Sequence, residues 1–286
     1  MSPSSAAASP QGSSGHRTNR DFLVGLFRAF GGALVFSLPL LMTMEMWSLS
    51  GMVEKERLAL LFLLSIPLLV GLSHYAGFEE TFGMLDDVVD AFVALAVGFV
   101  TSAGILALLG VITPGMAAGD VMAKVAVQAV PGSIGALLAA SQFGTPEEEE
   151  EERHRFTRYD GELFLMGVGS IFFAFNLAPT DEMVAIANQM SEMQVIGLVA
   201  VSLVIMHAFV YAVKFSGTPE TPEGTPRWSL FLRFTIPGYA IALLMSLYIL
   251  WTFGRMDGVS LETAIGTTVV LAFPGAIGAA SARLVL

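Results

Sequence analysis

GALVFSLPLLMTMEM, residues 32–46, is repeated 137 positions later as GSIFFAFNLAPTDEM, residues 169–183. Six aligned positions are identical without a gap: Gly, Phe, Leu, Thr, Glu and Met. The first four are spaced four, four and three residues apart, which places them on one face of a helix in both copies. Each copy therefore ends an apolar helical segment with one carboxylate, Glu45 or Glu182. In membrane proteins, matched positions in two halves indicate a site at the interface between repeats.

A second repeated stretch lies near the end of each half. Residues 127–136 read VQAVPGSIGA, and residues 270–279 read VLAFPGAIGA. Proline removes a backbone donor and glycine loosens the turn, so Pro131–Gly132 and Pro274–Gly275 predict paired kinks in two membrane helices. The pairs are either purely structural kinks or the hinges and pore lining of a gate.

The composition is that of an integral membrane protein. Hydrophobic residues make up 54% of the chain, charged residues 14%, and the mean hydropathy is +0.69. Apolar runs of roughly 18 to 25 residues match the length that a helix needs to cross a hydrocarbon core about 30 Å thick. Backbone groups cannot bond to lipid, so the fold class is all-α and polytopic. The absence of cysteine excludes disulfides, thiolate metal sites and thiol catalysis.

The apolar runs predict about eight membrane-spanning helices in two fused four-helix repeats. The predicted spans are 22–47, 58–76, 88–112, 118–140, 160–179, 193–213, 229–252 and 262–284. Four spans in each half return the chain to its starting side, so the repeats are expected to be parallel. The predicted divisions are a disordered cytoplasmic tail at 1–21, a first membrane repeat at 22–142, an acidic cytoplasmic linker at 143–159 and a second membrane repeat at 160–286.

Basic residues in the connections predict the orientation of the chain. Most of them fall on the side of the N-terminus, which places both termini in the cytoplasm. The residues on that side are Arg17, Arg20, Arg153, Arg155, Arg158, Lys214, Arg227 and Arg283, against Lys55, Arg57 and Arg255 on the other.

The residues most expected to carry a function are the two glutamates and their neighbours. A carboxylate at membrane depth costs about 2.5–3.5 kcal/mol, so it usually faces a protein interior or a hydrated cavity. Pro179 followed by acidic residues predicts that the fifth span ends near Leu177 and restarts as a new helix. A broken helix exposes carbonyl oxygens that bind cations together with carboxylates and hydroxyls. The predicted cation or proton site consists of Glu45, Glu182, Asp181, Thr43 and Thr180; the alternative is an outer cap without a role.

His207 is placed in the middle of the sixth span. It is either a hydrogen-bonded packing residue or a proton relay, because histidine changes charge near neutral pH. No catalytic constellation and no metal-binding spacing occurs in the sequence, so we expect neither an enzyme nor a cofactor, and the identity of any metal stays open.

The TMEMW stretch at 43–47, the APTDEM stretch at 178–183 and the pattern of spans resemble an uncharacterised family of bacterial polytopic integral membrane proteins, a domain of unknown function. The resemblance covers the chain from about Arg20 onward. It implies a multi-pass helical protein of the bacterial inner membrane and brings no established activity.

These observations predict an ion channel or an ion-coupled transporter, whose acidic site favours cations. The alternative is a scaffold or sensor that does not transport and that docks a partner through the acidic linker. The expected partners are the lipid bilayer and a small ion or solute; no nucleic acid is expected, and association into a homo-oligomer is left open.

Overall fold

The computed structural model describes residues 19–76, 84–142, 159–211 and 227–285. Within these residues, eight helices are long and apolar enough to cross a membrane, which confirms the number of predicted spans. We call residues 19–142 the first half and residues 159–285 the second half. The first half contains α1 (Asn19–Leu41), α2 (Met44–Leu49), α3 (Lys55–Ala76), α4 (Met84–Leu108) and α5 (Ala118–Gln142). The second half contains α7 (Tyr159–Leu177), α8 (Glu182–Gln189), α9 (Glu192–Tyr211), α10 (Arg227–Leu230), the π-helix η1 (Phe231–Thr235), α11 (Ile236–Thr252) and α12 (Leu261–Val285).

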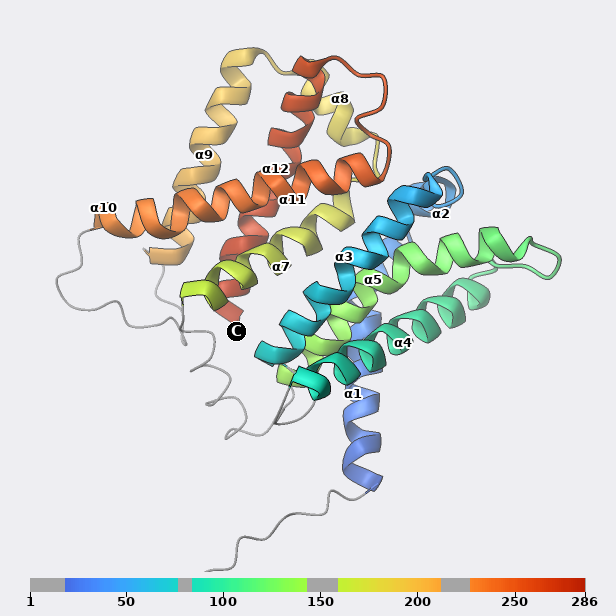
Figure 1. Cartoon of the computed structure of the whole chain (residues 1–286). Helices are drawn as coiled ribbons and strands as arrows, with labels where there is room; N and C mark the ends of the chain where they lie inside the picture. The colour runs from blue at the N-terminus through green and yellow to red at the C-terminus, as the bar shows by residue number, and fades with distance from the viewer. Residues whose placement is uncertain (1–18, 77–83, 143–158, 212–226, 286) are drawn as a thin grey trace, which may run out of the picture.

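The long helices form a bundle with two ends (Figure 1). We call the near end the one where α1, α4, α7 and α10 begin, and the far end the one where the short helices α2 and α8 lie. The predicted tail and linker lie outside the described residues except for positions 19–21 and 159.

The first predicted span, 22–47, is too long, because α1 ends at Leu41 and α2 begins at Met44. The hydroxyl of Thr43 donates to the carbonyl of Pro39 at 2.5 Å and so holds the chain in the turn that follows α1. In the second half, the predicted break after Leu177 is present, since α7 ends there and α8 begins at Glu182.

Glycine brings two pairs of long helices into backbone contact. In the first half, α1 packs on α5 where Gly32 faces Gly135, and a Cβ added to Gly135 would lie 2.5 Å from the Gly32 carbonyl oxygen. In the second half, α7 packs on α12 in the same way, and Gly169 faces Gly278 with no room for a side chain on either. Small residues allow this closeness, which drives helix association in lipid.

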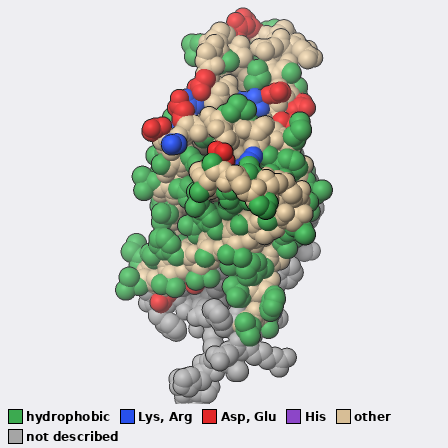
Figure 2. Space-filling model, turned by 90° about the vertical axis from the view of Figure 1, so that its right-hand side faces the viewer, with side chains coloured by type: hydrophobic (Ala, Val, Ile, Leu, Met, Phe, Trp, Pro, Cys, Tyr) green, Lys and Arg blue, Asp and Glu red, His purple; other side chains and the backbone are tan. Residues whose placement is uncertain are grey.

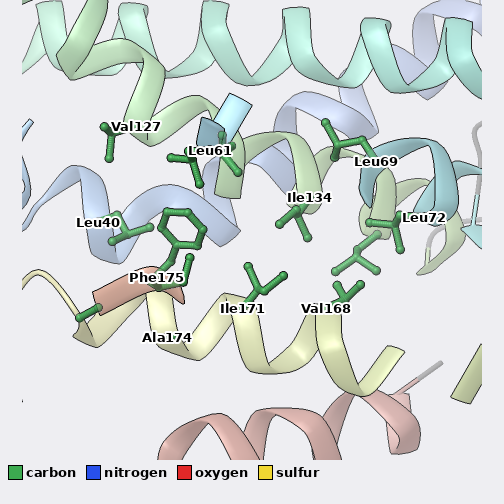
Figure 3. Packing of buried hydrophobic residues seen from close by; sticks show 14 of the residues in the cluster. Leu40, Leu61, Leu69, Leu72, Val127, Ile134, Val168, Ile171, Ala174 and Phe175 are labelled. Carbon is green, nitrogen blue, oxygen red and sulfur yellow. The ribbon is translucent and has the colours of Figure 1, made fainter. Parts of the chain in front are cut away.

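The two halves meet through side chains of one apolar core. Figure 3 shows Val168, Ile171, Ala174 and Phe175 of α7 facing buried residues of the first half, among them Ile134 of α5. The rings of Phe36 and Phe172 lie 4.8 Å apart across this interface. Towards the near end, the rings of Tyr75 and Phe164 lie 5.4 Å apart.

The surface separates apolar from charged side chains. Figure 2 shows hydrophobic side chains over the middle of one face and acidic and basic side chains gathered above them, towards one end. Exposed large hydrophobic residues such as Phe27, Leu63 and Val204 lie on the long helices. This distribution suits a lipid-facing belt with charged groups at its border.

Candidate functional site

The break between α1 and α2 frees backbone carbonyls at the far end, because the last four C=O groups of a helix lack an intrahelical partner. The Leu38 carbonyl accepts from the backbone N–H of Met42, and polar side chains donate to the other three. Thr43 donates to Pro39, Gln128 donates to Leu40 at 3.2 Å, and the indole of Trp47 donates to Leu41 at 2.8 Å. The hydroxyl of Thr43, predicted as a cation ligand, is therefore bonded to the end of α1.

A lysine ammonium approaches the same break from α5. Lys124 Nζ donates to the carbonyl oxygen of Trp47 at 2.6 Å, and that oxygen also accepts from the hydroxyl of Ser50 at 2.8 Å. The side chain of Lys124 is partly buried, and it forms no ion pair within the part of the chain that the structure describes. The positive charge thus rests on a backbone carbonyl near the C-terminal end of α2, which carries partial negative charge.

The break between α7 and α8 has a different basic residue. Arg255, in the connection from α11 to α12, donates to Asp181 Oδ1 at 2.5 Å and to the carbonyl of Pro179. The hydroxyl of Thr180 donates to the carbonyl of Leu177 at 2.8 Å. Asp181 is thus the carboxylate of an ion pair at the far end, although its own side chain is exposed.

Glu45 and Glu182 each lie in the first turn of a short far-end helix, α2 and α8. Glu45 is partly buried and Glu182 is exposed. Neither pairs with another described residue. A shared hydrated cavity between these two carboxylates stays a prediction.

Both proline–glycine pairs lie inside unbroken helices. α5 continues through Pro131 and α12 continues through Pro274. The carbonyl oxygen of Gly275 accepts a hydrogen bond from Ser170 on α7 at 3.0 Å, and Gly132 lies against Gly98 of α4. The pairs therefore sit at helix contacts, and their use as a gate stays a prediction.

His207 lies one turn before the end of α9, which places it close to the bundle's near end. The prediction that it lies in the middle of its span was therefore wrong. The Nδ1 of His207 is 2.9 Å from the hydroxyl oxygen of Thr235, the last residue of η1.

Pro237 lies two residues after the end of η1, and it lacks the N–H that a regular α-helix would direct at the Arg233 carbonyl. The hydroxyl of Tyr159 donates to that carbonyl at 2.9 Å instead. A π-helix of this kind often marks a functional position.

Two sets of polar contacts between helices were not predicted from the sequence. At the far end, Arg57 of α3 donates to Asp257 Oδ1 at 2.8 Å and to the carbonyl of Trp251 at 2.6 Å, and its guanidinium lies 4.9 Å from the Trp251 ring centre. This contact joins the first half to the second. At the near end, Asp87 is 4% exposed and its Oδ2 lies 3.1 Å from Nδ1 of His74.

The near end also carries a contact between halves. The hydroxyl of Tyr75 on α3 donates to Asp160 on α7 at 3.4 Å. No cluster of three or more His, Asp or Glu side chains placed to hold a metal ion occurs within the described ranges.

Comparison with known families agrees with this architecture. Residues 25–286 match the family described as integral membrane protein DUF2391. The chain belongs to this family. The match covers both halves, so the resemblance suggested by the TMEMW and APTDEM stretches is confirmed. No curated protein and no solved structure matches the chain.

Proposed function

We propose that this integral membrane protein is an ion channel or an ion-coupled transporter for a cation or proton. The observation that carries the proposal is a long helix in each half that ends at the far end and is followed by a short helix with a glutamate in its first turn. Interrupted helices supply carbonyls, and carboxylates supply charge, where membrane transporters bind ions. In this proposal Glu45 and Glu182 attract the ion.

In this proposal, the remaining predicted residues assist the two glutamates in binding and moving the ion. Thr43, Thr180 and Asp181 add oxygen atoms beside the glutamates, with Arg255 setting the charge at Asp181. Pro131–Gly132 and Pro274–Gly275 allow the last helix of each half to move against its neighbours, and His207 relays protons at the near end.

The proposal includes two repeats and one orientation. Glycine-to-glycine packing of α1 on α5 and of α7 on α12 supports a duplicated unit. The excess of basic residues in the near-end connections supports a cytoplasmic location for both termini in the bacterial inner membrane.

The two halves contact one another through side chains, and this supports movement between them. Polar contacts join the halves at both ends, Arg57 with Asp257 at the far end and Tyr75 with Asp160 at the near end. Phe36 packs on Phe172 between these contacts. Opening one polar contact while the other stays closed would expose the interface to one side of the membrane at a time.

The test is ion flux in liposomes containing purified protein. The double variant Glu45→Gln and Glu182→Gln should abolish flux driven by a cation or proton gradient. The matched control is Glu56→Gln with Glu192→Gln, because these exposed glutamates lie in the first turns of α3 and α9 and should leave flux unchanged.

Equal flux in the double variant and in the wild-type protein would remove the glutamate pair from the mechanism. No flux in the wild-type protein under any gradient would favour the alternative, a scaffold or sensor that docks a partner through the acidic linker. Apart from position 159, the linker lies outside the described residues.

A further inference from the structure

A histidine and an aspartate meet at the near end, where α3 ends and α4 begins (Figure 1). His74 lies in the last turn of α3, and Asp87 lies in the first turn of α4. The Nδ1 atom of His74 is 3.1 Å from Oδ2 of Asp87. This distance is that of a direct hydrogen bond, so one hydrogen lies between the imidazole and the carboxylate.

The two members of this pair differ in exposure. The side chain of His74 is 61% exposed, whereas that of Asp87 is 6% exposed. Met84 and Leu85, which precede Asp87 on α4, are large apolar residues and are largely exposed. Such side chains suit lipid, so the apolar surface of α4 begins before Asp87. The imidazole is therefore open to the near end, and the carboxylate lies behind it.

Asp87 also has an oxygen atom that the contact with His74 does not use. Its Oδ1 is buried and has no hydrogen-bond donor within the described part of the chain. Leaving a buried acceptor unpaired costs about 1–3 kcal/mol. Ionisable side chains at membrane depth are rare, and they mark ion pathways and proton relays. A proton on this carboxyl group would remove the negative charge that the unpaired oxygen shares.

The charged or titratable side chains on the near-end parts of the helices around the pair are mostly acidic. Among the side chains that the structure describes, they are Asp86 and Asp90 on α4, Tyr75 on α3, Asp160 and Glu162 on α7 and Arg28 on α1. Asp90 accepts from the hydroxyl of Ser73 at 3.4 Å. An excess of negative charge raises the local concentration of cations, protons included.

We propose that the His74–Asp87 pair is a proton-binding site that takes up a proton from the near-end water. An ionised carboxylate only accepts hydrogen bonds, so Nδ1 of His74 carries the hydrogen and Nε2 is the basic nitrogen. A proton that binds Nε2 releases the Nδ1 proton to Oδ2 of Asp87, and the negative charge of the pair is neutralised. That this proton is the transported one rests on the proposed function, whereas the site itself does not.

The second half repeats this contact without the carboxylate. His207 lies near the end of α9, which is the second span of its half as α3 is of the first. Its partner at the start of the third span is the hydroxyl of Thr235, 2.9 Å from Nδ1. A hydroxyl donates and accepts hydrogen bonds but does not store a proton near neutral pH. The proton-binding carboxylate is therefore a feature of the first half and not of the corresponding contact in the second.

Nuclear magnetic resonance of detergent-purified protein, labelled with ¹⁵N-histidine and ¹³C-aspartate, tests the site in a pH titration. The chain has four histidines, and His74→Gln identifies the signals of His74. We expect the Asp87 carboxyl carbon to respond over the same pH interval as the His74 ring nitrogens, because coupled groups titrate together. His74→Gln should abolish the Asp87 response in that interval. Asp86→Asn is the matched control, because Asp86 is exposed on the same turn of α4 and its loss should leave the response unchanged.

An Asp87 signal that stays constant while His74 gains its proton would overturn the proposal, because the contact would then be structural. An Asp87 response that survives in His74→Gln would overturn it as well. The titration of the wild-type protein does not depend on a folded variant. Proton binding by the pair without flux in liposomes would leave the site standing and would refute only the transport proposal, and flux without proton binding by the pair would do the reverse.

Discussion

Replacing Gly135 by alanine tests the packing on which the whole first half depends. The added Cβ would lie 2.4 Å from Cβ of Phe36 and 2.5 Å from the carbonyl oxygen of Gly32. Ordinary van der Waals contact begins at about 3.4 Å, so α1 and α5 must move apart by about 1 Å at this point. Gly31 is one residue from Gly32 on the same helix, and a Cβ there meets nothing within 4 Å.

The expected magnitude follows from this displacement. A gap of about 0.5–1 Å forfeits a quarter to a half of the dispersion attraction between the facing atoms. Overpacking of this kind costs about 1–3 kcal/mol. In a helix interior, replacing glycine by alanine by itself raises the free energy of unfolding by about 0.5–1 kcal/mol, because alanine restricts the unfolded chain. Gly135→Ala should therefore lower the free energy of unfolding, whereas Gly31→Ala should leave it equal or slightly raised, with about 1–3 kcal/mol between the two variants.

Equilibrium unfolding by dodecyl sulfate in mixed micelles, followed by circular dichroism, measures the difference. Gly278→Ala in the second half should behave like Gly135→Ala, because it faces Gly169 in the same way. The reasoning is refuted if Gly31→Ala costs as much as Gly135→Ala, because a position whose added Cβ meets nothing would then be as sensitive as one that faces the neighbouring helix.

Two further variants test polar contacts by the same unfolding measurement. Arg57→Ala should cost about 1–3 kcal/mol, because it removes charge-assisted hydrogen bonds. The exchange Arg57→Asp with Asp257→Arg should recover part of this stability, and no recovery would argue against a direct ion pair. Tyr159→Phe should cost about 1 kcal/mol by leaving the Arg233 carbonyl without its donor. The cost of Tyr159→Phe should be smaller when Pro237 is also replaced by alanine, because the restored backbone N–H of residue 237 can donate to the Arg233 carbonyl. A double-mutant cycle that shows no coupling between positions 159 and 237 would contradict this role of Tyr159.

The spans were predictable because bilayer thickness sets the length of an apolar run and charged residues mark its borders. The break after α7 was predictable as well, since Pro179 cannot continue a helix and acidic residues suit the first turn of the next one. The corresponding break after α1 was missed. Thr43 ends that helix through a hydrogen bond to Pro39, which its position in an apolar run does not reveal.

The partners of buried polar groups were not predictable from one sequence. Hydropathy fixes where a helix crosses but not its rotation about its own axis, so it does not reveal which neighbour a side chain meets. Arg57 and Asp257 are 200 positions apart and carry no local pattern that joins them. Lys124 was counted as part of an apolar span, although a lysine four residues before a glutamine on one helix face was a usable signal.

The π-helix η1 changes the direction in which side chains at the start of the seventh span point around the helix axis, relative to those in the rest of the span. Each residue of an α-helix turns the chain by about 100°, because a full turn takes 3.6 residues. The wider turn at Phe231–Thr235 accommodates one residue more than an α-helical turn would. Trp228 therefore points about 100° away from the direction that a regular helix would give it. Deleting one residue of η1 would leave the membrane-spanning helix α11 in place, but it would rotate the side chains of α10 toward a different neighbour.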